Sequence, residues 1–422
     1  MNASGLANTP AEGLSDGAPS RRGLPPLLPI FLIVLVDVLG FTIILPLLPF
    51  YSERLGASPT VVGLIVAIYA FFQLLAGPIL GQISDRIGRR PVLLISQAGT
   101  LAGFLLLAFS THVWMVFLSR AIDGATAGNL SIAQAYISDV TKPENRAKSF
   151  ALIGVAFGFG FLVGPAISGF LAHYGYGAPV FAAAALSLTS ILCTYFLLPR
   201  QEAHHEAAEN PGPGGKRLSL LSWGSYAKYF RDPELSRLLV QWLLFALSFS
   251  AFVSGFALFA ERRYQWDGHA VGVREVGFIF AFNGFIGIIM QGGMVGRLVK
   301  VLGERRVVQI GFLTFALANI AIGFTYTIPQ LLWVAGISAV GSAGLRPGIT
   351  SLITQKAGRR EQGVVLGLTQ SLTSIAQIAA PIISGVLIAH QFLTPWAIWA
   401  GVMSGLALPF GMSNRTSRAV KA

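Results

Sequence analysis

The sequence is poor in charged residues for its length. Only 11% of its 422 residues are charged, whereas 54% are hydrophobic. A water-soluble chain of this size would place roughly a quarter of its residues in charged types to cover its surface. The composition therefore excludes an ordinary soluble protein and indicates a chain whose surface faces lipid.

Cysteine and nucleotide-binding motifs are also scarce. The single cysteine, Cys193, lies in an apolar run, which excludes an internal disulfide framework or a cysteine metal cluster. No phosphate-binding loop of the form Gly-x-x-x-x-Gly-Lys-Ser/Thr occurs, so the sequence gives no support to ATP as an energy source. His204 and His205 are adjacent, but no further histidine lies near them in the sequence. We therefore expect neither a metal nor a cofactor.

The net charge of +12 does not indicate a nucleic-acid partner. Nucleic-acid binding needs basic residues clustered on a soluble face, and here they lie between apolar runs. Most of them fall in loops on the side that holds both termini, while the other side keeps Arg54, Arg262, Arg263 and Arg274. The positive-inside rule then predicts a multi-pass protein of the cell (inner or plasma) membrane with both termini in the cytoplasm.

Twelve apolar runs are long enough to cross a membrane, since a spanning helix needs about 20 mainly apolar residues. They fall near 27–50, 59–83, 91–110, 113–137, 147–173, 178–198, 235–260, 272–298, 306–325, 329–353, 362–389 and 394–412. The sequence therefore predicts an all-α membrane protein with twelve transmembrane helices.

A polar stretch separates six of these spans from the other six. We expect six-helix bundles over 27–198 and 235–412, joined by a cytoplasmic linker over 199–234. An interfacial helix over 218–230 is a further expectation. Residues 1–26 lack the apolar core of a signal peptide and are expected to be a disordered cytoplasmic tail, as 413–422 are expected to be a second tail.

The two halves also repeat each other at a nearly constant offset. Pro165, Ser168 and Gly169 recur as Pro381, Ser384 and Gly385, and Gly81, Gly88 and Arg90 recur as Gly296, Gly303 and Arg305. Two similar halves in the same orientation form the parallel-repeat architecture of alternating-access transporters. That architecture predicts a binding site near mid-membrane, between the halves.

The loop over 81–91 reads Gly-Gln-Ile-Ser-Asp-Arg-Ile-Gly-Arg-Arg-Pro and resembles the cytoplasmic signature of the major facilitator superfamily. Asp85 and Arg89 are one helical turn apart and can pair. The resemblance implies a gate in which Asp85 meets the start of span eleven and Arg89 meets Asp139. The implied gate residues are Gly81, Asp85, Arg86, Gly88, Arg89, Arg90 and Asp139. In the second half Lys300 takes the place of Asp85, so that copy is degenerate.

Span five carries a stripe of small residues. Gly160, Gly164 and Ser168 recur every four residues, which lets another helix pack closely, and Pro165 can bend the helix. The segment resembles the antiporter motif of exporters in the same superfamily. The implied motif residues are Gly154, Gly158, Gly160, Gly164, Pro165, Ser168 and Gly169. Gly284, Gly292 and Gly296 of span eight form a candidate partner stripe, and a purely structural stripe is the alternative.

Charges inside spans are costly and usually functional. Asp37 lies near the middle of span one, where the sequence resembles the tetracycline and multidrug proton antiporters. The resemblance implies that Asp37 carries a proton, and a structural carboxyl is the alternative. Arg120 matches the membrane arginine of the family that is assigned to proton coupling. Asp123 lies one turn on and can neutralise it, so a purely structural pair stays open.

Several polar residues near mid-span are candidates for the substrate cavity, because an unpaired amide in lipid is expensive. They are Tyr69, Gln73, Asn129, Asn283, Arg346 and Gln377. Arg346 has three open interpretations: it attracts an anionic substrate group, it balances Asp37, or it reaches toward the inner interface. Helix-to-helix hydrogen bonds are the alternative role of the amides.

The resemblance covers residues 27 to 410 and implies a major facilitator fold and secondary active transport. Tetracycline exporters carry an acid in span three near Gly103, which this sequence lacks. We therefore expect a proton-coupled antiporter that exports a small amphipathic compound or drug, not an enzyme. Its partners would be that substrate, protons and the lipid bilayer, and it would act as a monomer. A proton-coupled importer or facilitator of a metabolite, or a non-transporting receptor, are the alternatives.

Overall fold

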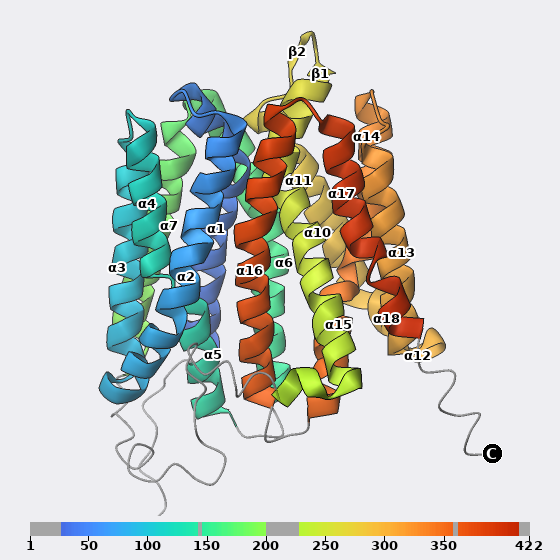
Figure 1. Cartoon of the computed structure of the whole chain (residues 1–422). Helices are drawn as coiled ribbons and strands as arrows, with labels where there is room; N and C mark the ends of the chain where they lie inside the picture. Colours follow the sequence, from blue (N-terminus) through green and yellow to red (C-terminus); the bar gives the residue numbers. More distant parts are fainter. Residues whose placement is uncertain (1–26, 142–145, 200–227, 358–361, 413–422) are drawn as a thin grey trace, which may run out of the picture.

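The computed structural model describes residues 27–141, 146–199, 228–357 and 362–412, and within them the chain is almost entirely helical (Figure 1). The first half contains α1 Leu27–Arg54, α2 Pro59–Ile87, α3 Arg89–Ala108, α4 Val113–Ala125, α5 Asn129–Val140, α6 Arg146–Leu171, the short turn η2 Ala172–Tyr174 and α7 Gly177–Leu197. The second half contains α10 Pro233–Arg263, α11 Val273–Ile289, the π-helical segment η3 Met290–Met294, α12 Val295–Leu302, α13 Glu304–Ile322, α14 Ile328–Ala343, α15 Leu345–Ala357, α16 Gln362–Ala389, α17 Leu393–Gly405 and α18 Leu408–Met412. The predicted tails and nearly all of the linker, including residues 218–227 of the predicted interfacial helix, lie outside the described residues.

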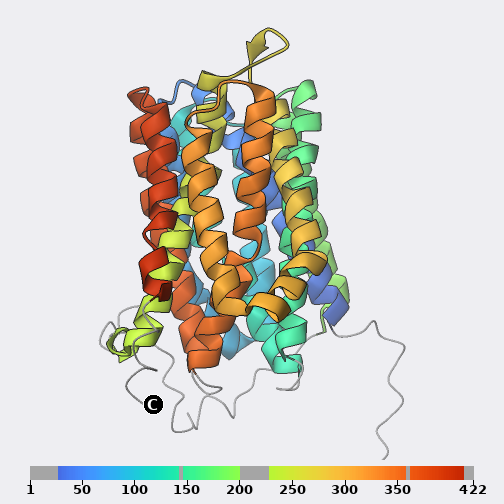
Figure 2. The same ribbon diagram turned by 90° about the vertical axis from the view of Figure 1, so that its right-hand side faces the viewer.

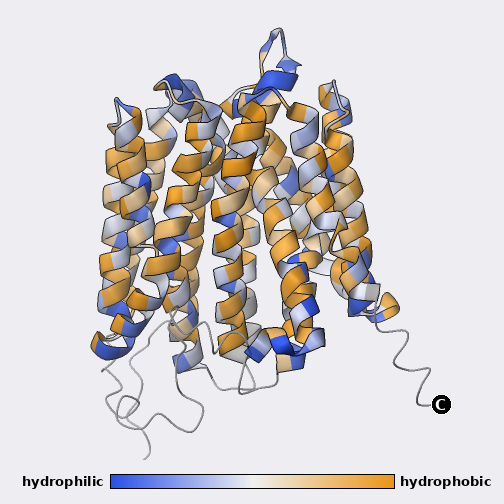
Figure 3. Ribbon diagram, viewed as in Figure 1, coloured by the Kyte–Doolittle hydropathy of each residue, from blue (hydrophilic) through white to orange (hydrophobic). Residues whose placement is uncertain are grey.

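Eleven helices among the described residues are long and apolar enough to cross a membrane. Figure 3 shows why: apolar residues cover the sides of the bundle and hydrophilic ones gather at its two ends. Large apolar side chains such as Phe109, Phe196 and Trp333 are accordingly exposed. The expected membrane fold is thus confirmed, and 113–137 is the predicted span that is not among these eleven helices.

That span is broken into α4 and α5 at residues 126–128. Thr126 turns its hydroxyl back to the carbonyl of Ile122 at 2.9 Å, which competes with regular helix bonding. Ser96 of α3 satisfies the groups that the break frees, because its Oγ donates to the carbonyl of Thr126 and accepts from the amide of Gly128 at 3.0 Å. Such breaks are tolerated in membranes where neighbouring side chains take over the backbone bonds.

The molecule has two ends, which we name by their features. The hairpin end carries β1 Gln265–Trp266 paired with β2 His269–Ala270, and the opposite, linker end carries the start of α1 and the last helix, α18 (Figures 1 and 2). The hairpin turns at Asp267 and Gly268 with φ of 49° and 82°, the geometry favoured by an Asp-Gly pair. This hairpin was not predictable from the sequence, because its strands are far shorter than a typical strand pattern.

The repeat predicted from the sequence is visible in the backbone of two turns at the linker end. Gly88, between α2 and α3, has φ 95° and ψ 157°, and Gly303, between α12 and α13, has φ 82° and ψ 152°. Residues with a side chain rarely adopt this conformation, so glycine is required in both. The charges beside the glycines are reversed in order, with Asp85 and Arg89 in one copy and Lys300 and Glu304 in the other.

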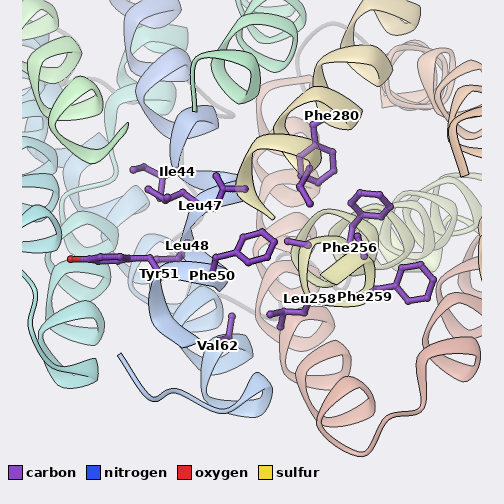
Figure 4. Close-up of a cluster of buried hydrophobic side chains, with 14 of the residues drawn as sticks. Ile44, Leu47, Leu48, Phe50, Tyr51, Val62, Phe256, Leu258, Phe259 and Phe280 are labelled. Atoms are coloured by element: carbon purple, nitrogen blue, oxygen red, sulfur yellow. The ribbon is translucent and has the colours of Figure 1, made fainter. Parts of the chain in front are cut away.

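Among the described residues, the main buried core shared by the two halves lies near the hairpin end. This core joins residues of α1, α2, α10 and α11, and Figure 4 draws part of it, including Leu48, Phe50, Val62, Phe256, Leu258 and Phe280. Toward the linker end, the larger clusters of buried residues in the described chain are separate. One belongs to the first half, with Ile33 and Tyr136, and one to the second, with Leu239 and Phe312.

Glycine contacts show the same asymmetry along the two seams between the halves. A methyl group at Gly63 of α2 would lie 2.3 Å from the carbonyl oxygen of Pro381 in α16, and one at Gly277 of α11 would lie 2.4 Å from that of Pro165 in α6. These contacts are near the hairpin end. Closer to the linker end, a methyl at Gly77, Gly81, Gly154 or Gly367 would meet no atom of a packed neighbour within 4 Å. The close approaches between the halves are therefore found near the hairpin end, and these four glycine positions toward the linker end make none.

Candidate functional site

Asp37 of α1 lies in a cluster of neutral polar side chains in the first half. It lies about 15 Å from the start of α1, at 1.5 Å per residue. Its carboxyl lies against Ser190 of α7, Asn129 of α5 and Gln97 of α3, and its Oδ2 is buried without a hydrogen-bond partner. Gln97 Nε2 in turn donates to Ser190 Oγ at 2.8 Å. Four helices thus converge on one carboxyl.

Arg120 and Asp123 of α4 form a buried ion pair next to this cluster. Arg120 Nη1 lies 3.1 Å from Asp123 Oδ2, and the two side chains are only 4% and 6% exposed. The guanidinium also lies over the ring of Phe104, 5.5 Å from its centroid, and its Nε and Nη2 are buried without partners. The pairing anticipated from the one-turn spacing is therefore present, and it takes Arg120 out of direct contact with Asp37.

Asp123 also fills the place beside Gly103. A methyl at Gly103 would lie 3.1 Å from the Cβ of Asp123. An acid from α4 thus lies beside the α3 position at which the resemblance implies an acid. A single sequence does not reveal this exchange, because it depends on how two helices pack.

Tyr69 and Gln73 of α2 lie beside these charges. Gln73 Nε2 donates to the hydroxyl of Tyr69 at 3.2 Å, and the Tyr69 ring stacks on Phe41 of α1 with centroids 6.2 Å apart. Tyr69 interacts electrostatically with Asp123, Arg120 and Asp37. The structure therefore brings six of the predicted residues into one region of the first half: Asp37, Tyr69, Gln73, Arg120, Asp123 and Asn129.

The small-residue stripe of α6 packs on α1, directly next to Asp37. A methyl at Gly160 would lie 2.5 Å from Val38, and one at Gly164 would lie 2.0 Å from Thr42 Oγ1. Thr42 Oγ1 donates to the carbonyl of Gly160 at 2.9 Å. Ser168, which continues the stripe, is fully buried.

The other residues of the span-five motif face α11 or open space. A methyl at Gly169 would meet the carbonyl of Arg274 at 2.8 Å, while Gly158 has ordinary contact with Ile288 and Gly154 has none. Of the candidate partner stripe, Gly284 packs on Phe161 of α6, whereas Gly292 and Gly296 contact no packed neighbour within 4 Å. The partner of the Gly160–Gly164 stripe is therefore α1 rather than the predicted span eight, which corresponds to α11, η3 and the start of α12.

The gate motif joins α2, α3 and α5 at the linker end. Arg89 is buried, pairs with Asp85, binds Asp139 Oδ2 through Nε at 2.9 Å, and donates to Ser84 Oγ at 2.7 Å. Arg90 instead donates to the carbonyl of Tyr195 and lies over its ring. Arg86 is exposed. The implied meeting of Asp85 with the start of span eleven stays a prediction, since residues 358–361, directly before α16, lie outside the described residues.

The predicted residues of the second half lie apart from the Asp37 cluster. Asn283 of α11 has a buried Oδ1 without a partner, and Gln377 of α16 is half-buried. Arg346 of α15 is exposed, and its guanidinium lies over the ring of Phe157 in α6, 5.4 Å from the centroid. Arg346 thus reaches across the seam between the halves.

Two groups of residues in the structure were not among the predicted site residues. Gln97 and Ser190 complete the Asp37 cluster. The sequence signal for them was the amide of Gln97 within an apolar span. At the hairpin end, Arg262 of α10 binds Glu53 of α1 and its neighbour Glu261. The sequence did hold a signal for this group. Glu53 and Arg262 carry opposite charges, and each lies at the hairpin end of its helix, α1 or α10.

Comparison with known proteins finds one matching family model and relatives that are resistance proteins. The model of the Major Facilitator Superfamily matches residues 30–300 and 292–415. The tetracycline resistance protein, class E, of Escherichia coli is 32% identical over 380 residues, which cover 88% of this chain and 89% of that protein. Multidrug resistance protein 2 of Bacillus subtilis is 26% identical over 369 residues, covering 85% and 88%.

A solved structure shares the fold. The human organic anion transporter MFSD10 (TETRAN) superposes with a TM-score of 0.69 at 24% identity, covering 92% of this chain and 99% of that one. Together with the apolar helices, the repeated halves and the gate motif, these relatives identify a multi-pass membrane protein and a secondary transporter. The chain belongs to the Major Facilitator Superfamily.

Proposed function

We propose that this transporter is a proton-coupled antiporter that exports a small amphipathic compound, with Asp37 as the group that carries the proton. The relatives named above are resistance proteins for tetracycline and for multiple drugs, which supports export over import. The contact between the α6 stripe and α1 adds support, because it couples the span-five motif to the helix that holds Asp37.

The observation that carries the proposal is the surroundings of Asp37. Its neighbours Gln97, Asn129 and Ser190 are neutral, and no ion pair within the described residues involves Asp37. A carboxylate in a membrane is costly without a counter-charge. Arg120, the cation beside this cluster, already binds Asp123. A proton is then the simplest counter-charge that Asp37 can take, and it can be released when the surroundings change.

We also propose how the protein is oriented in the membrane and which state of the transport cycle the structure represents. With the linker end in the cytoplasm, as the distribution of basic residues favours, the structure is the state that opens to the cytoplasm. The six-helix units would be 27–198 and 235–412. In the alternating-access cycle, the hairpin end would open and the two six-helix bundles would come together at the linker end. The gate motif would then lie at the surface that closes.

The test is transport by purified protein in vesicles with an imposed proton gradient. Asp37→Asn fixes the side chain in a neutral form, so we expect gradient-driven accumulation to be lost while downhill exchange of substrate continues. Direct pairing of Asp37 with a cationic substrate predicts instead that binding itself is lost. Full gradient-driven transport by the variant would move the proton path to Asp123 and Arg120.

The direction of coupled flux decides between export and import. In vesicles of known orientation, export predicts that substrate and protons move in opposite directions. Movement in the same direction would support a proton-coupled importer, and transport that ignores the gradient would support a facilitator.

A further inference from the structure

Arg346 is a cation at mid-membrane depth on the seam between the halves. It lies about 16 Å from the linker end of α15, and Phe157 lies at a similar depth in α6, at 1.5 Å per residue. The guanidinium carbon is 5.4 Å from the centroid of the Phe157 ring. One half of the protein therefore supplies the charge and the other supplies an aromatic wall.

No acid of the described chain neutralises this charge. The ion pairs among the described residues involve Arg89, Arg120, Arg262, Arg305 and Lys356, and none involves Arg346. An arginine keeps its proton in essentially all protein environments, so it cannot become neutral to lower the cost. A charge at this depth is expected to find a partner.

Arg120 shows how the same chain completes such an arrangement elsewhere. Both arginines lie over a phenylalanine ring, Arg120 over Phe104 at 5.5 Å and Arg346 over Phe157 at 5.4 Å. Arg120 is also bound by Asp123 at 3.1 Å and is buried, whereas Arg346 is exposed and has no such partner within the described residues. The missing element at Arg346 is therefore an anion.

The position of Gly154, beside this pair, is not filled by a packed neighbour. Gly154 lies one turn from Phe157 on the same face of α6, and a methyl group there would meet no atom of a packed neighbour within 4 Å. The guanidinium offers planar, paired donors that match a carboxylate or a sulfonate. Phe157 offers an apolar surface to the body of such a molecule.

We propose that Arg346 binds the anionic group of the substrate, so that the exported compounds are amphipathic organic anions, with a carboxylate or sulfonate on Arg346 and an apolar body against Phe157. This rests on the proposed function and narrows it to a substrate class. In this arrangement the proton binds Asp37 in the first half and the substrate binds Arg346 in the second half. Proton and substrate therefore do not compete for one side chain.

The test uses fluorescein and rhodamine 123, which share a tricyclic ring system and carry opposite charges. Full-length protein in vesicles should transport fluorescein, and Arg346→Gln should reduce that transport roughly tenfold or more, since charge-assisted hydrogen bonds are strong. Arg346→Lys should keep part of it. Arg297→Gln, which removes an exposed cation of α12, should leave it unchanged. Fluorescein binding to the purified protein, measured by polarisation, should fall in parallel.

Three outcomes would overturn the proposal. The first is a wild-type protein that carries rhodamine 123 but neither binds nor carries fluorescein. The second is fluorescein transport by Arg346→Gln at the wild-type rate. The third is rescue of Arg346→Gln by Asp37→Asn, which would show that Arg346 serves to balance Asp37. Downhill fluorescein exchange that depends on Arg346 but ignores the proton gradient would refute the antiport proposal and leave the anion site standing.

Discussion

Arg262 Nη2 at the end of α10 donates to Glu53 Oε1 at the end of α1 across 2.5 Å, and so links the two halves at the hairpin end. The same guanidinium binds Glu261 through Nη1 at 2.9 Å. Both partners of the inter-half pair are largely buried, at 20% and 18% exposed. The pair lies at the end where the shared apolar core also joins α1 and α10.

Glu53→Gln should favour opening of the hairpin end, because it weakens a link that only the closed end makes. An ion pair of this exposure is worth about 1 kcal/mol, so the closed population should fall severalfold relative to the open one. Spin labels at Thr111 and Phe324, in a variant with Cys193→Ser, report the separation of the halves by pulsed distance measurements. Arg54→Gln is the matched control, since Arg54 contacts Tyr176 within the first half. An unchanged distance distribution in Glu53→Gln would show that the apolar core alone holds this end.

Gly164→Ala and Gly154→Ala should differ in their effect on stability. A methyl at Gly164 would lie 2.0 Å from Thr42 Oγ1, so α1 and α6 must separate, at a cost of about 1–3 kcal/mol. A methyl at Gly154 meets no packed neighbour, and alanine favours a helix by up to about 1 kcal/mol over glycine. Thermal unfolding of the two purified variants checks this. Equal melting temperatures would contradict the close approach of α1 and α6.

Asp85→Asn should slow transport without preventing folding or insertion. The substitution removes one carboxylate from Arg89, which keeps Asp139 and Ser84, so the first half stays assembled. The lost charge is expected to change the balance between states by about 1–2 kcal/mol, which slows turnover severalfold. Turnover and melting temperature are measured together, with Gln82→Ala as an exposed control on the same helix. Normal turnover would remove Asp85 from the gate.

Gln97→Leu should reduce gradient-driven transport about tenfold, because it removes a polar neighbour of Asp37 and frees Ser190 from its bond to Gln97. The pH profile of transport should also move, which a loss of packing alone would not cause. Gln134→Leu, on an exposed face of α5, is the control. A proportional loss of protein in the membrane, with an unchanged pH profile, would assign Gln97 a purely structural role.

The proposed orientation predicts opposite labelling of two introduced cysteines in the Cys193→Ser background. A cysteine at Pro213 should resist an impermeant reagent in intact cells and react once the membrane is permeabilised. A cysteine at Thr111, at the hairpin end, should react in intact cells. Labelling at Pro213 in intact cells would reverse the orientation and with it the direction assigned to the open state.

The helices were predictable because each span carries its own apolar signal. Leu27–Arg54 and Gln362–Ala389 coincide closely with the predicted runs, since lipid selects for length and apolarity along a single segment. The break at 126–128 was not predictable, because Ser96 of another helix satisfies the broken bonds. Local sequence holds no record of that partner.

Some residues of the candidate site were likewise predictable from the sequence, and others were not. Arg120 and Asp123 could be paired from their spacing, because a helix places residues one turn apart on one face. Gln97 and Ser190 could not be assigned to Asp37, because the three residues come from three different helices whose packing is set by the whole bundle. The stripe on α6 was evident in the sequence, but its partner α1 was not.

The turns at Gly88 and Gly303 share a backbone and reverse their charges. An axis along the membrane normal relates the halves of a parallel repeat. Two identical charge pairs, Asp85 with Arg89 and a copy of it, would then have electric dipoles whose components along the normal add. With Lys300 and Glu304 in the second turn, those components oppose each other. The linker end therefore repeats the backbone of the turn while reversing the order of its charges along the direction in which the membrane potential acts.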